Sequence, residues 1–381
     1  MRLAILGTKG IPNQYGGFEQ FAEYLSKGLV ERGHEVTVYN PHFHQFQGTE
    51  YAGVKIERVF SPEKVIGAAA NYIYDFLCLR HALNCNYDII YEAGYGSVAV
   101  SYLLLPLQRS LILTNMDGLE WKRAKWNKVI QRVTRYAERI AVKRSDYIIS
   151  DNIGIQAYYK KEFRKDSFYL PYGATVVNTF DPAVLDLYQL SQKSYYLVIA
   201  RMEPENNIEV ILDAFVNAPV AEQLVLIGNV ANAYGKKMTR QFNHPRIKFS
   251  GGIYDKRHLD SLRYFSKGYL HGHSVGGTNP SLLEAMACQC NIIAHKNSFN
   301  SSVLTENAVY FNDAGELTNI FEAFDPTREH HGKFRQNNLN RIKEYYDWDK
   351  VIGDHEKLFN ELLESGRKFP KADVIRAKGK P

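Results

Sequence analysis

The feature that most constrains the fold is an alternation of short apolar segments with longer amphipathic ones, repeated along the chain. Residues 3–6 are uniformly apolar, and residues 18–32 carry apolar side chains at helical spacing. Short apolar segments of this kind are typical of strands buried on both faces of a parallel sheet and joined by helical crossovers. The pattern therefore predicts an α/β protein built from βαβ units.

The alternation forms two series, which are separated by polar and turn-forming residues at 176–194. In the first series we predict strands at residues 3–6, 35–39, 54–59, 87–91, 111–114 and 147–150, and helices at 18–32, 71–83 and 153–163. In the second we predict strands at residues 195–200, 224–227, 247–250, 268–271, 291–294 and 308–311, and a last helix at 348–364. The length of 381 residues fits two domains, and a cleft between them is the natural ligand site.

Composition excludes several classes of protein. The chain is 45% hydrophobic and 23% charged, as soluble globular proteins are, and its net charge of +6 does not by itself indicate nucleic acid. The four cysteines are too few for a disulfide framework in a chain of this length. Cys288 and Cys290 could suggest a metal site, but no second pair of Cys or His stands at zinc-finger spacing, so we expect buried, reduced thiols.

The sequence shows no signal-peptide pattern at its start, and its most apolar segment is residues 98–107. That segment is far shorter than the roughly 20 residues that a membrane-spanning helix needs. Residues 121–144 carry nine Lys or Arg and one acid, Glu138, with apolar residues at helical spacing. This basic amphipathic segment is either a surface for anionic lipid or an ordinary solvated face. We expect a cytoplasmic protein, either soluble or peripheral on a membrane.

Two glycine-rich loops follow predicted strands and precede predicted helices. Residues 276–280 lead into a helix at residues 281–288. A glycine loop entering a helix N-terminus binds phosphate readily, and Glu284, one turn in, can accept a hydrogen bond from a ribose hydroxyl. The alternative is an ordinary strand-to-helix turn. The other loop, residues 7–17, is too long for the G-x-G-x-x-G fingerprint, which disfavours a simple NAD site.

Two charged residues stand at predicted strand ends. Arg201 directly follows a strand and can form paired hydrogen bonds with a phosphate. Together with the loop at 276–280 and Glu284, it predicts a nucleoside diphosphate bound by the second domain. Asp117 stands just past another strand, where catalytic residues of α/β proteins gather. A helix cap or a turn would also use an Asp at that position.

The layout resembles the GT-B glycosyltransferases of the large retaining family known as family 4, over nearly the whole chain to about residue 364. The motifs that carry the resemblance are Gly16 with Gly17, residues 200–208 and residues 279–287. Residues 7–19, 117–123 and 271–280 more narrowly resemble a bacterial subgroup that includes rhamnosyltransferases of capsule and other surface-polysaccharide assembly. The family implies two Rossmann-like domains that face a central cleft.

The resemblance assigns a role to each part of the chain. Residues 1–178 would be the acceptor-side Rossmann-like domain, and residues 190–350 the domain that binds the nucleotide sugar. Residues 351–364 would form a C-terminal helix that packs back towards the N-terminal domain. Residues 365–381 are predicted to be a basic mobile tail.

The family also implies roles for individual residues. Arg201 would contact the donor diphosphate, Glu284 would hold the ribose, and Asp117 would contact the acceptor hydroxyl or the donor sugar and act as a base; these three are the predicted catalytic residues. The other predicted donor-binding residues lie on the glycine loops, beside the nucleobase or at strand ends: Gly16, Gly17, Asn206, Gly228, Gly252, Ile253, Gly277, Thr278, Asn279, Pro280, Ser281 and Leu282.

Three positions depart from the family pattern. Gly276 stands where the family usually has a second Glu, eight residues before Glu284. Asn206 stands where the family usually has a Lys, so one cation on the diphosphate is missing. Asp117 lies in the region where many members place a His. The first two changes leave the contacts to the donor sugar and the diphosphate open.

Family members transfer a sugar with retention of configuration, and the sequence offers no evident protein nucleophile. We therefore expect front-face substitution, in which the leaving diphosphate helps to deprotonate the acceptor and the protein supplies orientation and electrostatic stabilisation. GT-B enzymes generally need no divalent metal, so no metal or other cofactor is expected. His271 and His273 are expected to have structural or hydrogen-bonding roles rather than to bind a metal.

These inferences favour an enzyme that moves L-rhamnose from dTDP-L-rhamnose onto a polyprenyl-diphosphate-linked saccharide at the inner face of the plasma membrane, without a nucleic-acid partner. Two other functions stay open at this point. One is a sugar-nucleotide epimerase of the same architecture. The other is a non-catalytic, nucleotide-binding scaffold of a polysaccharide assembly complex, which would suit the absence of the family's Glu and Lys.

Overall fold

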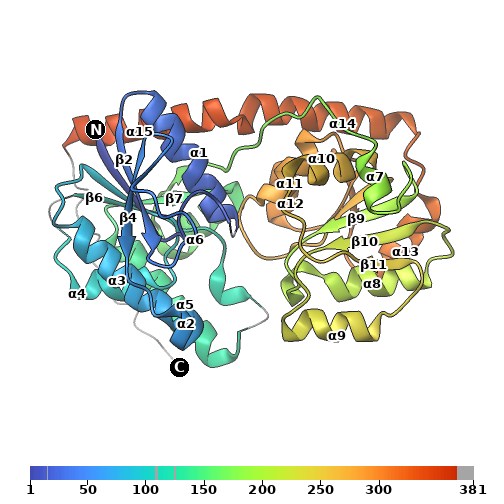
Figure 1. The fold of residues 1–381 in the computed structure, drawn as a ribbon, viewed down its shortest axis with the longest axis horizontal. Helices are drawn as coiled ribbons and strands as arrows, with labels where there is room; N and C mark the ends of the chain where they lie inside the picture. The colour runs from blue at the N-terminus through green and yellow to red at the C-terminus, as the bar shows by residue number, and fades with distance from the viewer. Residues whose placement is uncertain (15, 108–109, 124–125, 367–381) are drawn as a thin grey trace.

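The computed structural model describes residues 1–366 except 15, 108–109 and 124–125. The first half of the chain forms an eight-stranded sheet in the order β3-β4-β2-β1-β5-β6-β7-β8 (Figure 1). Within the described residues, β3 and β4 pair in antiparallel fashion and the other neighbouring strands of this sheet pair in parallel. The strands are β1 Arg2–Leu6, β2 Glu35–Pro41, β3 Glu50–Tyr51, β4 Val54–Val59, β5 Ile89–Glu92, β6 Leu111–Asn115, β7 Tyr147–Ser150 and β8 Phe168–Tyr169.

Helices cover both faces of this sheet because the side chains of each strand alternate between two cores. Leu3 and Ile5 of β1 lie in a core shared with the first helix, whereas Ala4 and Leu6 lie in one shared with the α3 helix. The helices of this half are α1 Gly17–Glu31, α2 Glu63–Ile66, η1 Gly67–Ala69, α3 Ala70–Ala82, α4 Val98–Leu104, η2 Glu120–Lys122, α5 Lys128–Arg144 and α6 Ile153–Phe163.

The second half forms a six-stranded parallel sheet in the order β11-β10-β9-β12-β13-β14. Its strands are β9 Tyr195–Ile199, β10 Gln223–Ile227, β11 Ile247–Phe249, β12 Gly268–His271, β13 Ile292–His295 and β14 Val309–Phe311. Its helices are α7 Val184–Leu187, η3 Pro204–Asn206, α8 Ile208–Asn217, α9 Ala233–Gln241, α10 Lys256–Phe265, α11 Pro280–Ala287, α12 Ser298–Leu304, α13 Ala314–Ala323 and α14 Glu329–Arg341.

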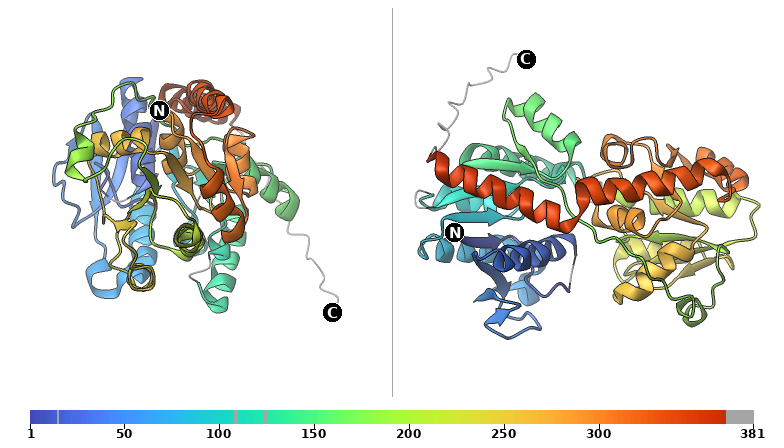
Figure 2. Two further views of the ribbon diagram at one scale, coloured as in Figure 1. Left: turned by 90° about the vertical axis from the view of Figure 1, so that its right-hand side faces the viewer. Right: turned by 90° about the horizontal axis from the view of Figure 1, so that it is seen from above.

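The end of the chain returns from the second domain to the first. After α14, a π-helical segment (η4 Ile342–Tyr346) leads into α15 Trp348–Ser365, which runs along the first domain beside α1 (Figures 1 and 2). The chain passes from the first domain to the second after Ala174 and returns after Tyr346. These two segments meet, because the Ala174 N–H donates to the Tyr346 carbonyl over 2.7 Å. The Trp348 ring then stacks on Tyr24 of α1, with ring centroids 4.4 Å apart. The first domain is therefore completed by a helix from the far end of the chain.

The predicted fold class is confirmed: the protein is an α/β protein with two Rossmann-like domains. The strands predicted at 147–150 and 268–271 and the helix predicted at 153–163 have the same bounds in the structure. These segments are strongly apolar or begin at a capping Asn, so local sequence decides them.

Other elements differ from the prediction. The basic segment at 121–144 is one long helix only from Lys128, where the Asn127 side chain accepts the N–H groups of Val129 and Ile130 and so begins the helix. The apolar segment at 98–107 contains α4, which the sequence analysis did not assign. Residues 367–381, most of the predicted basic tail, lie outside the described residues. No helix in the described part of the chain is both long enough and apolar enough to cross a membrane.

The Trp348 side chain should contribute strongly to stability, because it is 7% exposed and packs between Tyr24 and the backbone of Gly173. Trp348→Ala should lower the free energy of unfolding by about 3–5 kcal/mol, as truncation of a buried aromatic residue does. Urea denaturation followed by circular dichroism measures this value. Tyr345→Ala is the matched control, since Tyr345 is 44% exposed. A loss below about 1 kcal/mol for Trp348→Ala would contradict this account of the crossing.

Candidate active site between the two domains

The carboxyl ends of the two sheets face each other across the domain interface, and the loops that follow their strands touch there. A Cβ atom added at Gly118, after β6, would lie 2.5 Å from the Cα of Gly276, after β12. One added at Gly17, at the start of α1, would lie 3.1 Å from the Cγ of Pro280, the first residue of α11. The backbone contact at Gly118 requires glycine there. The contact between Gly17 and Pro280 brings the two predicted glycine loops, residues 7–17 and 276–280, together at one site.

The α11 helix begins in the way that its sequence predicts. Asn279 is the N-cap, and its side chain accepts the N–H of Ser281 over 2.9 Å. The Ser281 hydroxyl lies 2.6 Å from the Tyr269 hydroxyl, and the Leu282 side chain is buried in the core. The cap and these contacts fix the helix N-terminus, which offers a positive dipole end towards the first domain.

Glu284 lies one turn into α11 and is held by two partners. Its carboxylate is 2.5 Å from an Nη of the buried Arg263 on α10, and it accepts a hydrogen bond from Gln20 Nε2 of the first domain over 3.0 Å. Burial by itself would raise the pKa of Glu284, but the charge of Arg263 and the Gln20 hydrogen bond lower it below its ordinary value. Glu284 is therefore ionised at neutral pH and placed at the interface.

Arg201 lies two residues after the end of β9 and is exposed, so its guanidinium can meet a ligand. Asn206, which was predicted to contact the donor, is instead buried, and its side-chain amide donates to the Arg201 carbonyl over 2.7 Å. Its amide therefore braces the loop that carries Arg201. Whether either residue contacts a donor stays a prediction.

His271 and His273 lie at the end of β12 with stacked rings whose centroids are 4.4 Å apart. Burial, and then the neighbouring His273 and His295, lower the pKa of His271 well below its ordinary value. Burial, followed by the positive charges of Arg201 and Arg123, lowers the pKa of His273 to about 3. Both imidazoles are therefore neutral at physiological pH and can take part in hydrogen bonds but add no positive charge.

Asp117 stands between β6 and η2 with a positive backbone φ of 42°, which is strained for a residue other than glycine. The N-cap of η2 is Leu119, so Asp117 does not cap that helix. An Asp117 carboxylate oxygen is 4.0 Å from Arg123, which also pairs with Glu120 and, across the interface, with Glu205 at 3.5 Å. Arg123 thus links the loop that carries Asp117 to the loop that carries Arg201.

The remaining predicted residues lie on the same two faces of the interface. Gly228 follows β10 and donates its N–H to the Gly251 carbonyl over 2.8 Å, which joins the ends of β10 and β11. Gly252 and Ile253 follow there, next to Tyr254, which is 80% exposed. Gly16 is the N-cap of α1 and has an extended backbone. Gly277 and Thr278 contact the first domain directly, through a contact described below.

Several residues at this site were not found from the sequence, among them Gln20, Glu205 and Arg263. Each takes part through contacts with residues far along the chain. Only a general rule would have pointed to Arg263, because a partly buried carboxylate such as Glu284 needs a cation or several donors beside it.

The residues at the interface do not form an evident metal site. Within residues 1–366 as described, no three His, Cys, Asp or Glu side chains gather as a metal ion would need. An Asp-x-Asp pair, a pattern that can hold a metal ion, occurs at the start of α15. Its two side chains have other roles, because Asp347 caps that helix and Asp349 pairs with Arg32.

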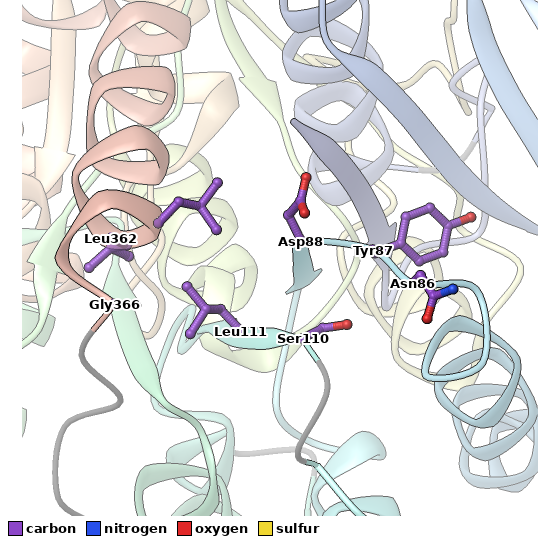
Figure 3. A pocket seen from close by; sticks show the side chains of 8 residues that line it. Asn86, Tyr87, Asp88, Ser110, Leu111, Leu362 and Gly366 are labelled. Atoms are coloured by element: carbon purple, nitrogen blue, oxygen red, sulfur yellow. The ribbon is translucent and has the colours of Figure 1, made fainter.

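A separate hollow of about 330 Å³ lies at the amino ends of strands of the first sheet, away from the interface (Figure 3). Asp88 and Ser110 line it just before β5 and β6, together with the end of α15 at Leu362 and Gly366. It borders the amino ends of these strands and so is distinct from the interface site.

Comparison with known proteins assigns the second domain to a family. Residues 188–338 match the family model "Glycosyl transferases group 1", and residues 1–175 match the model "Domain of unknown function (DUF1972)". The second domain is a group 1 glycosyltransferase domain. An uncharacterized glycosyltransferase of Methanocaldococcus jannaschii is 22% identical over 95% of this chain and 99% of its own length.

Solved structures agree on the GT-B fold. Sucrose-phosphate synthase from Thermosynechococcus elongatus superposes with a TM-score of 0.77, at 15% identity over 96% of this chain and 99% of that one. HepE from Anabaena, solved in complex with UDP-glucose, superposes with a TM-score of 0.73, also at 15% identity and with the same coverage. In this glycosyltransferase domain, the exposed Arg201, the N-terminus of α11 and the ionised Glu284 lie along the edge that faces the first domain.

The Arg263–Glu284 pair can be tested by a double-mutant cycle. Arg263→Met leaves the partly buried Glu284 carboxylate without its paired cation, whereas the buried Asp260 keeps Lys256, and it should lower the free energy of unfolding at pH 7 by about 3 kcal/mol. Adding Glu284→Gln should recover part of the loss, since it removes the uncompensated charge. Urea denaturation of the four proteins measures the coupling.

The same pair predicts a pH dependence. Arg263 lowers the pKa of Glu284 in the folded state. The ion pair therefore stabilises the fold fully above the ordinary Glu pKa of 4.5, and this stabilisation is lost as the pH falls through the lower pKa that Glu284 has in the folded protein. The stability difference between the parent protein and Arg263→Met should therefore shrink below about pH 4. A difference that is the same at pH 7 and pH 3 would show that the pair is not electrostatic in origin.

Proposed function

We propose that the protein is a retaining glycosyltransferase that takes L-rhamnose from dTDP-L-rhamnose and adds it to a polyprenyl-diphosphate-linked saccharide in surface-polysaccharide synthesis. The observation that carries the proposal is the arrangement on the second domain, where an exposed Arg201, a helix N-terminus and an ionised Glu284 face the first domain together. An arginine and a helix N-terminus bind a diphosphate, and an ionised carboxylate accepts hydrogen bonds from ribose hydroxyls.

Structures of two proteins that share this fold support a nucleotide-sugar donor. HepE was solved with UDP-glucose and with UDP, and a TarM variant of S. aureus was solved with UDP and a saccharide. In this protein the nucleobase would pack against residues 251–254, where Tyr254 is exposed for stacking. The deoxyribose would lie at Glu284, and the diphosphate at Arg201 and the N-terminus of α11.

The proposed reaction proceeds at the same face of the sugar that the leaving group occupies. The C–O bond between the anomeric carbon and the diphosphate breaks, the acceptor oxygen forms the new bond, and the hydroxyl proton passes to the leaving phosphate oxygen. Arg201 stabilises the negative charge that develops on the diphosphate. The neutral His271 and His273 supply no charge, so Arg201 and backbone N–H groups provide most of this stabilisation. Asp117 would orient the acceptor hydroxyl.

The donor can be identified by calorimetry with a panel of dTDP, UDP and GDP sugars. The proposal expects dTDP-L-rhamnose to bind and to be slowly hydrolysed in the absence of acceptor. Arg201→Ala should lower kcat/KM about 100-fold or more, because charge-assisted stabilisation of the transition state is lost. Arg240→Ala on α9 is the control, since this exposed arginine lies on a different helix.

The alternative functions give different results in the same experiments. An epimerase would convert the donor without acceptor, which NMR of the nucleotide sugar would detect. A scaffold would bind nucleotide without turnover on any acceptor. Failure of every nucleotide sugar to bind would contradict the proposal as a whole.

We further propose that the first domain lies on the inner face of the plasma membrane. Large apolar side chains are exposed on neighbouring helices, among them Val129, Val133 and Tyr136 on α5 and Leu103 and Leu104 on α4. The basic residues Lys128, Arg132, Arg135, Arg139 and Lys143 of α5 accompany them. An apolar patch bordered by cations complements an anionic bilayer, where a lipid-linked acceptor would be anchored.

Sedimentation with lipid vesicles tests this surface. Binding should be stronger to vesicles that contain phosphatidylglycerol than to phosphatidylcholine alone and should weaken at high salt. Val133→Asp should reduce binding about 10-fold. Leu187→Asp on α7 should not, although Leu187 is exposed to a similar extent at 67%, because it belongs to the second domain. Equal loss in both variants would contradict a specific surface on the first domain.

A further inference from the structure

A carboxylate from the first domain sits directly on the glycine loop of the second. Asp151 follows β7, and its side chain accepts the N–H of Thr278 over 3.0 Å. In return the Thr278 hydroxyl donates to the Asp151 backbone carbonyl. Asp151 is 1% exposed and Thr278 2% exposed, so this two-point contact is buried.

The loop is shaped around this carboxyl group. A Cβ atom added at Gly277 would overlap the Asp151 carboxyl atoms, so only glycine permits the carboxylate to lie there. The preceding residue, Gly276, is approached by Gly118 of the first domain, and there it is Gly118 that must lack a side chain. Two consecutive residues of the loop thus meet two segments of the first domain, and one of these segments brings a carboxylate.

One oxygen of this carboxyl group is left over. Asp151 Oδ1 is buried and has no hydrogen-bond partner among the described residues, whereas Oδ2 receives the Thr278 N–H. Burial, and then the nearby charge of Asp117, raises the pKa of Asp151 well above its ordinary value. A ligand hydroxyl that donates to Oδ1 would favour the ionised carboxylate and would satisfy a buried polar atom that is otherwise left without a partner.

The position of this oxygen coincides with the chief departure of the sequence from its family. Gly276 stands where the resemblance implies a Glu, and the Asp151 carboxyl lies against the very next residue of the same loop. We propose that Asp151 supplies from the first domain the carboxylate that the family carries at the position of Gly276, and that its free oxygen accepts a hydrogen bond from a hydroxyl of the donor sugar. The inference rests on the proposed function.

This assignment has a structural consequence. The family's Glu belongs to the same domain as the nucleotide, whereas Asp151 belongs to the opposite one. The sugar-binding carboxylate is therefore present only when the two domains are in contact. Binding of the sugar, but not of the nucleotide alone, should depend on that contact.

Asp151→Asn separates the sugar contact from the contact with Thr278. Its amide oxygen can still accept the Thr278 N–H, but its NH₂ group can no longer accept a sugar hydroxyl. We expect the affinity for dTDP-L-rhamnose to fall about 10- to 100-fold, while that for dTDP changes less than about twofold. Calorimetry with both ligands measures the two affinities, and Asp151→Ala, which loses both contacts, should weaken both.

Asp146→Asn is the matched control. Asp146 stands at the other end of β7, is also buried, and likewise accepts a backbone N–H, that of Ile112, over 2.9 Å. The Asp146→Asn variant should bind dTDP-L-rhamnose and dTDP as tightly as the parent protein does. An equal loss of affinity for sugar nucleotide and nucleotide in Asp151→Asn, or no loss for either, would overturn the role of Asp151 and leave the proposed function standing. Failure of the parent protein to bind any nucleotide would instead overturn the proposed function, and this inference with it.

Discussion

The contact between the loops that follow β6 and β12 is the constraint on which the rest of the site depends. Parallel strands deliver all their carboxyl ends to one edge of a sheet, so each domain offers one edge lined with loops. The two edges meet here at backbone distance, through Gly118 and Gly276. That approach brings Gln20 to Glu284 and Asp151 to Thr278. It is held from the far side of the molecule by α15, which packs on α1 through Trp348.

The charges at the interface follow from this geometry. Glu284 is kept ionised by Arg263, whereas the two buried histidines are kept neutral. Arg123 is shared by acids of both domains, whereas Arg201, just past the end of β9, is exposed. The site thus presents an exposed positive side chain beside a helix N-terminus, an arrangement suited to a diphosphate group.

Much of this architecture is predictable from the sequence, because local patterns decide it. Apolar segments fix the strands, and a glycine loop followed by Asn279 and Pro280 fixes the start of α11. Arg201 and Glu284 are found because each stands at a fixed offset from a strand or helix end. The roles of Arg201, Glu284 and Asp117 and the donor contacts stay predictions.

The sequence does not reveal partners that come from elsewhere in the chain. Arg263 contacts a residue that lies 21 positions along the chain, Gln20 one that lies 264 positions along and Asp151 one that lies 127 positions along, and no local pattern marks them. The inward orientation of Asn206 depends on the fold of its own short loop. The start of α5 depends on a single capping residue, Asn127, within a segment whose charge and periodicity extend further.

The central claim is that the interface between the domains is a nucleotide-sugar site. A crystal structure of the protein with dTDP-L-rhamnose tests it most directly. The account predicts the diphosphate at Arg201 and the N-terminus of α11, the deoxyribose at Glu284, and the sugar towards Asp151 and Asp117. A ligand bound elsewhere, for example in the hollow beside the end of α15, with the interface unoccupied, would contradict it.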